Sequence, residues 1–179
     1  MVKIYQNTFS YEHPWENVSL AFWLRYPNPF ASHVLGADVL DRRVDSEGCL
    51  HTTRILLKKG VLPKWGSKIM KNNEAFIIEE SVINPHNNTM VTRTKNLNHT
   101  RIMQVEETQT FKPHPEQAQW TKVTTEARII SNLGWGLTGK LEGFGMKKFA
   151  DNTIKSRKGM SHVLEMIREK QLLRGRRFM

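Results

Sequence analysis

The sequence predicts a single α+β domain in which an antiparallel sheet of about seven strands is covered by a long C-terminal helix. Extended apolar runs, divided by short turn-forming segments, fill residues 33–133. These links are too short to hold crossover helices, so neighbouring strands should pair antiparallel. Residues 134–173 then follow a helical period to the end of the pattern. A chain of 179 residues, 39% of them hydrophobic, has enough material for one continuous core.

A first strand over residues 2–9 and a short helix precede the sheet region. Pro14 stands where a helix can begin, because its fixed backbone angle suits the first helical turn. The Tyr-Pro-Asn-Pro segment at 26–29 ends that helix, because a residue before proline is pushed out of the helical conformation. Arg25 is therefore expected on the buried face of a helix, near its end. That face comprises residues at spacings of 3, 4 and 3: Trp15, Val18, Phe22 and Arg25.

Six extended runs follow, and the segments between them are rich in Asn, Asp, Gly and Pro, which favour turns. One link is longer than the others: residues 60–73 mix apolar side chains with lysines. A connection of this length in a compact domain is often a functional lid. A surface loop packed on its own side chains is the alternative interpretation. The six predicted strands comprise residues 33–44, 49–59, 74–83, 89–98, 101–111 and 120–131.

The long helix carries polar side chains in the middle of its inward face. At 100° per residue the inward stripe comprises Leu137, Leu141, Phe144, Gly145, Ser156, Gly159 and Val163. The polar residues on this stripe are Lys148, Asn152 and Lys155. Burying a bare cation between two layers is costly, and few acidic partners are expected because Glu16 and Glu142 fall near the exposed sides of their helices. Two interpretations stay open: the cations face an anion-binding cavity, or they are ion-paired or extend to water at the helix edge.

Composition and motifs exclude several other classes. The 27 Lys and Arg against 17 Asp and Glu give a net charge of +10, which favours anionic partners such as phosphates, nucleic acid or an acidic membrane. The segment 134–139 matches G-x-G-x-x-G, but no parallel strand follows the helix, so we interpret it as a strand-to-helix junction. Cys49 alone cannot form an internal disulfide, and the histidines lack metal-ligand spacing, so neither a metal nor a cofactor is expected. Neither a targeting peptide nor a membrane-spanning run is evident.

Five segments of the chain carry a further signal: RYPNP at 25–29, HVL at 33–35, RILLKKGVLPKW at 54–65, NLNHTRIMQVEE at 96–107 and KSRKGM at 155–160. Together they resemble the PRELI/Ups family of mitochondrial intermembrane-space lipid transfer proteins. The resemblance runs through nearly the whole chain. It implies a START-like helix-grip fold whose sheet and helices enclose a lipid cavity, closed by a lid loop.

The resemblance also implies how the chain is divided and which residues act. Residues 1–172 would form a PRELI/MSF-type lipid transfer domain, and residues 173–179 a basic tail. Positions that match the family would bind the lipid head group: Arg25, His33, Lys58, Lys148, Asn152 and Lys155. Others would form the lid and contact the membrane: Val61, Leu62, Pro63, Lys64, Trp65 and Lys68. The expected partner is a small helical protein of the intermembrane space with twin cysteine motifs, and the bound phospholipid is cargo, not a cofactor.

Arginine before Tyr-Pro-Asn-Pro, together with His33, resembles the phosphatidic acid carriers of the family. The implied function is transfer of phosphatidic acid between the outer and inner mitochondrial membranes for cardiolipin synthesis, without chemical conversion, by a protein peripherally associated with the inner membrane. A phosphatidylserine carrier stays open, because a cationic pocket also accepts a phosphodiester. A nucleic-acid-binding module would need aromatic and basic residues interleaved on one exposed face. An enzyme of the same fold would need a positioned carboxylate base, which the pattern does not provide.

Overall fold

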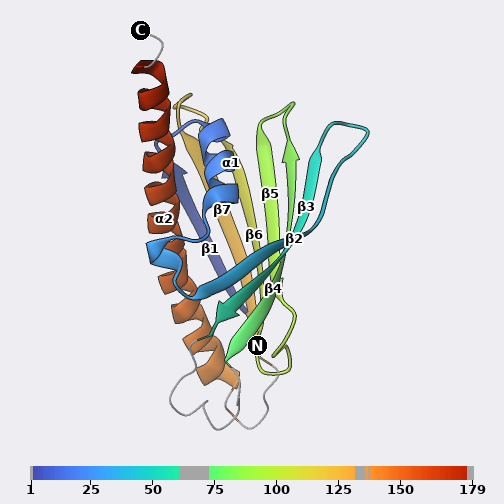
Figure 1. Cartoon of the computed structure of the whole chain (residues 1–179). Coiled ribbons are helices and arrows are strands. Elements are labelled where there is room, and N and C mark those ends of the chain that lie inside the picture. Colours follow the sequence, from blue (N-terminus) through green and yellow to red (C-terminus); the bar gives the residue numbers. More distant parts are fainter. Residues whose placement is uncertain (1, 61–72, 132–135, 137, 177–179) are drawn as a thin grey trace.

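The computed structural model describes residues 2–60, 73–131, 136 and 138–176, and shows a curved sheet with a long helix packed across it (Figure 1). Among the described residues, seven antiparallel strands form one sheet in the order β1-β7-β6-β5-β4-β3-β2. The elements are β1 (Val2–Tyr11), α1 (Trp15–Leu24), the 3-10 helix η1 (Pro29–Ala31), β2 (Val34–Val44), β3 (Leu50–Lys59), β4 (Glu74–Asn84), β5 (Thr89–Asn96), β6 (Gln104–Pro113), β7 (Thr121–Ile130) and α2 (Thr138–Arg176). The predicted fold class is confirmed.

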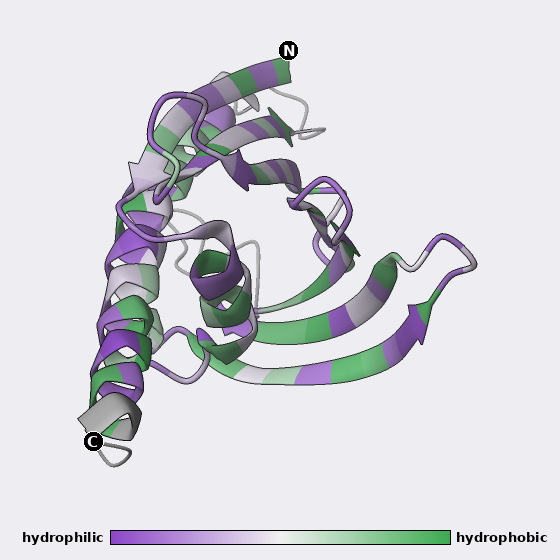
Figure 2. Ribbon diagram, turned by 90° about the horizontal axis from the view of Figure 1, so that it is seen from above, coloured by the Kyte–Doolittle hydropathy of each residue, from purple (hydrophilic) through white to green (hydrophobic). Residues whose placement is uncertain are grey.

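The sheet is a meander that β1 extends by pairing with β7. Each strand from β2 to β7 pairs with the next along the chain, so β1 and β2 are the edges. The β2–β3 ladder shifts register between Val34 and Gly36 and again between Val39 and Asp41. Such irregularities bend a strand, and Figure 2 shows the sheet curving around α1. The curvature leaves a concave face on which both helices lie.

The hydrophobic core lies where α1 is enclosed by the sheet and the C-terminal half of α2. Val18 and Phe22 are fully buried, and the ring centroids of Phe22 and Phe111 are 5.8 Å apart. The buried cluster comprises Tyr11, Trp15, Val18, Ala21, Phe22, Met90, Phe111, Val123, Met160, Val163, Leu164 and Ile167. Burial of a large apolar side chain stabilises a fold by about 1.5–3 kcal/mol. This cluster therefore fixes α1, and with it Arg25, which directly follows the helix as its C-cap.

The inward face of α2 agrees with the prediction at most positions. Leu141, Gly145, Gly159 and Val163 are buried and Phe144 is half-buried, whereas Leu137 lies outside the described residues. Ser156 is exposed to solvent but borders the space between α2 and the sheet, as its place on the inward stripe predicts.

Glu142 was expected near an exposed side but is fully buried. The reason is that the start of α2 packs against the end of β7, where the backbone amide of Ser131 donates to the Glu142 carboxylate at 3.3 Å. The helix runs to Arg176, past the predicted end at residue 173. Among the described helices, none is long and apolar enough to cross a membrane.

Candidate functional site

A cavity of about 620 Å³ lies between the concave face of the sheet and the N-terminal half of α2. Its volume falls in the usual range for sites that hold small molecules or cofactors. Apolar side chains from both layers cover much of the wall, among them Ile77, Val105, Leu141, Phe144 and Phe149. The cavity begins where the core cluster ends, because Met160 of α2 belongs to both.

All six residues predicted to bind a head group line this one cavity. Arg25 follows α1, His33 precedes β2, Lys58 lies near the end of β3, and the other three lie on α2. The full set in the wall is Arg25, His33, Lys58, Lys148, Asn152 and Lys155. The structure therefore brings together side chains that are up to 130 positions apart in the sequence, counting from Arg25 to Lys155 (155 − 25).

Positive charge accumulates around His33. Burial lowers the pKa of His33, and the neighbouring charges of Lys58, Lys155 and Lys148 lower it further. Within the described residues, no acidic side chain forms an ion pair with any of these three lysines. The wall of the cavity around His33 is therefore cationic and suited to an anionic group.

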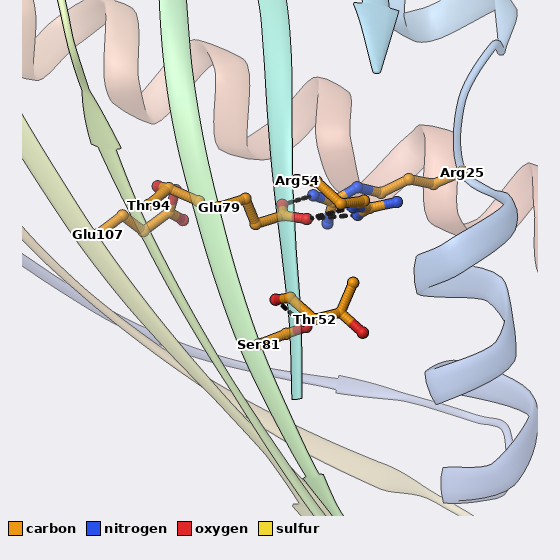
Figure 3. A network of polar contacts seen from close by, with 7 residues as sticks. All are labelled: Arg25, Thr52, Arg54, Glu79, Ser81, Thr94 and Glu107. Carbon is orange, nitrogen blue, oxygen red and sulfur yellow. Dashed lines mark hydrogen bonds and ion pairs between the residues drawn. The ribbon is translucent and has the colours of Figure 1, made fainter. Parts of the chain in front are cut away.

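Arg25 does not face the cavity as an unpaired cation. It is 8% exposed, and its Nη2 donates to Oε2 of Glu79 on β4, which is 1% exposed. The other carboxylate oxygen, Oε1, accepts from Arg54 on β3, with the Arg54 Nε at 2.8 Å. Figure 3 shows the two guanidiniums converging on one carboxylate. The expectation that acidic partners are scarce is wrong here, because a strand rather than a helix supplies the partner.

The pairing of β3 with β4 places Arg54 directly opposite Glu79. Burial by itself raises the pKa of Glu79, but Arg25 and Arg54 outweigh it, so that the pKa lies below its ordinary value. Burial likewise tends to lower the pKa of Arg25, but the Glu79 carboxylate, with smaller contributions from Tyr26 and Glu107, raises it above its ordinary value. The group is thus a buried, fully ionised triad of two cations and one anion.

Asn28 and Gly159 hold Arg25 at the edge of the cavity. The Asn28 amide Nδ2 donates to the backbone carbonyl of Arg25, and its Oδ1 accepts from the Phe30 amide at 2.9 Å. A Cβ at Gly159 would lie 2.9 Å from the Asn28 side chain, closer than real contacts allow. Glycine at this position lets α2 pack directly on the turn that ends α1. Two of the quoted sequence segments, RYPNP and KSRKGM, therefore meet in space.

A second carboxyl group, Glu107 on β6, also lines the cavity. The Thr94 hydroxyl donates to it at 3.5 Å, at the long end of hydrogen bonding. Burial raises the pKa of Glu107 above its usual range. Figure 3 places Glu107 and Thr94 on the far side of Glu79 from Arg25.

Sequence reasoning missed three members of this site: Arg54, Glu79 and Glu107. The available signal was strand alternation. Glu79 shares its parity with Ala75 and Ile77, which also line the cavity. An acidic residue on the inner face of an apolar strand indicates a buried polar group that needs a partner.

The predicted lid residues Val61, Leu62, Pro63, Lys64, Trp65 and Lys68 lie outside the described residues. The residues at the two ends of this segment are held together: the Asn73 side-chain amide donates to the Gly60 carbonyl at 3.2 Å. A Cβ at Gly60 would lie 2.7 Å from the Asn73 carbonyl oxygen, so the close approach requires glycine.

No group of three or more His, Cys, Asp or Glu side chains that could hold a metal ion occurs in the described ranges. Cys49 is buried at the β2–β3 turn and does not line the cavity. What the site offers chemically is an apolar enclosure, a cationic wall and an ionised triad at its edge.

A curved antiparallel sheet and a long C-terminal helix that enclose a cavity between them define a START-like helix-grip domain. Solved structures with this fold include a protein of Thermus thermophilus, with a TM-score of 0.62 at 16% identity, covering 92% of this chain and 99% of that one. Another is the Zhui aromatase/cyclase from Streptomyces sp. R1128, with a TM-score of 0.63 at 10% identity and coverage of 92% and 94%. At these identities the likeness shows the fold alone.

The chain belongs to the PRELI-like family, whose model matches residues 16–170. It is 41% identical over 170 residues to "Protein UPS1, mitochondrial" of Saccharomyces cerevisiae, and the match covers 94% of this chain and 97% of the relative. It is 40% identical over 154 residues to "PRELI domain-containing protein 1, mitochondrial" of Gallus gallus, where the match covers 84% and 71%. The sequence resemblance is confirmed.

Proposed function

We propose that this protein carries phosphatidic acid between the outer and inner mitochondrial membranes, where it supplies cardiolipin synthesis without making or breaking a bond. The observation that carries the proposal is the single cavity in which apolar walls end in a cluster of cations around His33. Membership of the PRELI-like family and the mitochondrial names of its relatives support the location.

The apolar walls answer the physical problem of moving a lipid through water. Two acyl chains with roughly thirty methylenes would cost on the order of 24 kcal/mol to expose, at about 0.8 kcal/mol for each. A carrier must therefore enclose the chains. The concave sheet face and the N-terminal half of α2 supply apolar surface on both sides of the cavity.

The cationic wall suits a phosphomonoester, which carries between one and two negative charges and no amine or choline to block close approach. Lys58, Lys148 and Lys155 offer positive charge and form no ion pair with an acidic side chain in the described part of the chain, although Lys58 is close enough to lower the pKa values of Glu79 and Glu107. Arg25 adds a guanidinium whose Nε is buried and has no hydrogen-bond partner among the described residues. A phosphate oxygen at that edge would satisfy it with a charge-assisted hydrogen bond.

A phosphatidylserine carrier is the second candidate, and Glu107 is the observation that favours it. This carboxyl group lines the same cavity as the lysines and could accept the ammonium of a serine head group. A serine head group carries an ammonium that can pair with Glu107, whereas phosphatidic acid carries none. A transfer assay in which the two lipids compete therefore separates the two candidates.

We further propose that a small helical protein with twin cysteine motifs binds this chain in the intermembrane space. The carrier would then meet anionic membranes peripherally, attracted by its net charge of +10. A binding module for nucleic acid is less well supported, because the clustered cations line a cavity rather than an exposed face.

The test is lipid transfer between liposomes, together with mass spectrometry of the lipid that co-purifies with the protein. Lys148→Glu should reduce phosphatidic acid extraction by at least about tenfold, since it reverses one charge in the cationic wall. Lys147→Glu is the matched control, because Lys147 is exposed and does not line the cavity. Equal loss in both variants would indicate a surface effect and contradict the site. Arg25→Glu is less clean, because a second carboxylate would then face Glu79.

A further inference from the structure

A carboxylate stands in the position that a lipid phosphate would be expected to take on the buried arginines. Glu79 accepts from Nη2 of Arg25 and from Nε and Nη2 of Arg54, and only 1% of it is exposed. Arg25 and Glu79 both line the cavity, whereas Arg54 does not. In the triad of Figure 3 both guanidiniums bond the same carboxylate, and two of the three members, Arg25 and Glu79, border the cavity.

Two aromatic rings lie close to the Arg25 guanidinium. Its central carbon lies 3.9 Å from the centroid of the Phe22 ring and 4.9 Å from that of Tyr26. Because guanidinium N–H groups point outward in the plane of the group, an oxyanion that bonds Arg25 approaches in that plane, where Glu79 already holds part of the edge. Glu79 and an incoming phosphate compete for the same kind of donor.

We propose that Glu79 is an internal counter-ion that limits how tightly the cavity holds an anionic head group. This inference rests on the proposed carrier function and explains a property that carriers require, namely release. Glu79 bonds Nη2 of Arg25 and both Nε and Nη2 of Arg54, and it leaves Nε of Arg25 without a partner among the described residues. When a phosphate enters, Arg25 bonds both the phosphate and Glu79. When the lipid leaves, the full ion pair between Arg25 and Glu79 forms again.

The charge balance of the wall shows why such a device matters. Lys58, Lys148 and Lys155 already attract an anion around His33, and Lys58 also acts on Glu79 and Glu107. Two unneutralised guanidiniums added to these lysines would bind an anionic head group too tightly for ready release, because charge-assisted hydrogen bonds in a buried site are strong. Glu79 reduces the net charge of the triad from that of two cations to that of one.

The experiment compares Glu79→Gln with Glu80→Gln. Both remove one negative charge, but Glu80 is exposed on the opposite face of β4 and does not line the cavity. Binding of dihexanoyl phosphatidic acid below its micelle concentration is measured by calorimetry, and transfer is followed between liposomes. Glu79→Gln should bind the soluble lipid on the order of tenfold more tightly and deliver it more slowly. Glu80→Gln should behave as the native chain does.

The outcomes separate this inference from the proposed function. Failure of the native chain to bind phosphatidic acid would refute the proposed function and the counter-ion role that depends on it. Equal binding by the native chain and folded Glu79→Gln would refute the counter-ion role alone. A gain on vesicles without a gain for the soluble lipid would place the effect at the membrane surface and also overturn the inference.

Glu79→Gln removes a buried partner and so risks failing to fold. In that case Arg54→Met is compared with the double variant Arg54→Met/Glu79→Gln, which keeps the net charge of the native triad. The double variant should bind inorganic phosphate and soluble phosphatidic acid more tightly than Arg54→Met. No difference between the two would overturn the inference.

Discussion

The two halves of α2 face different surroundings although they belong to one continuous helix. From Met160 to Ile167 the inward side chains belong to the apolar core around α1. From Leu141 to Arg157 the helix borders the cavity. The polar residues that the sequence predicts on the inward side all lie in the stretch along the cavity: Lys148, Asn152 and Lys155.

The difference shows how a helical pattern can indicate a cavity. An inward lysine is costly where two layers are in contact, because the charge is then removed from water without compensation. It is tolerated where the layers part, since solvent or an anion can reach it. The inward polar residues of α2 therefore mark where the sheet and the helix separate, and Gly159 lies at the end of that stretch.

The largest effect on stability is expected from Glu79→Gln, at the edge of the cavity that the N-terminal half of α2 borders. Removing one partner of a buried ion pair costs about 3–5 kcal/mol. The pKa of Glu79 is lowered in the folded state, so its stabilisation is present above its ordinary value of 4.5 and is lost as the pH falls through the folded value. Urea unfolding at neutral and at acidic pH measures this. The difference between native and variant should shrink at low pH, and a constant difference would contradict the ionised triad.

In the C-terminal half of α2, which packs in the core, Leu164→Ala should lower the free energy of unfolding by about 2–5 kcal/mol. Leu164 is 1% exposed, so its truncation leaves a cavity in the core. Leu172→Ala is the control on the same helix, since Leu172 is 59% exposed. Denaturant unfolding measures both. Lipid transfer per folded molecule should not change in either variant; selective loss of transfer in Leu164→Ala would show that the two halves are not independent.

At the boundary between the halves, Gly159→Ala should cost about 1–3 kcal/mol, because the new methyl group meets the Asn28 side chain. The same substitution at Gly143, where a Cβ would have no neighbour within 4 Å, should instead stabilise the helix by about 0.5–1 kcal/mol. Thermal unfolding checks the opposite signs. Because Asn28 holds the backbone of Arg25, only Gly159→Ala should also weaken phosphatidic acid binding. A change in stability of the same sign in both variants would contradict the close packing of α2 on Asn28.

Much of the fold can be predicted because local sequence signals act over short distances. Turn residues divide the predicted strands, and a helical period alone places Arg25 and Lys148 on inward faces, where both line the cavity. Glu142 shows the limit of this reasoning. Its position on a helical wheel says nothing about the end of β7, which packs beside it and donates the Ser131 amide.

The helical period also predicts the inward lysines of α2, whereas His33 and Lys58 are assigned only by the family resemblance, and the pairing of Arg54 with Glu79 is not predicted. Arg25 pairs with Glu79 across 54 positions, and Arg54 meets Glu79 through a strand register. The β3–β4 register is not set by a tight turn, because residues 60–73 separate the strands. Alternation alone can place Glu79 on the inner face, but it cannot identify which cation lies opposite.

The smallest effect is expected on the pH dependence of anion binding, through proton uptake by His33 in the wall of the cavity. Burial and the charges of Lys58, Lys155 and Lys148 lower the pKa of His33, so a bound anion should raise it again. Binding then takes up a proton, and affinity should increase as the pH falls from about 8 to about 6. A shift of one pKa unit corresponds to about 1.4 kcal/mol, so the change should be at most about tenfold. Phosphatidic acid itself gains a proton in this range, which works in the opposite direction.

A short-chain phosphodiester lipid, whose charge is constant between about pH 6 and pH 8, removes that complication. With this probe the native chain should bind more tightly at the acidic end of that range, whereas His33→Asn should bind equally at both ends. Calorimetry in buffers of different ionisation enthalpy measures the proton taken up directly. The same pH dependence in His33→Asn would assign the proton to another group, and no proton uptake by the native chain would show that the anion lies away from the cations around His33.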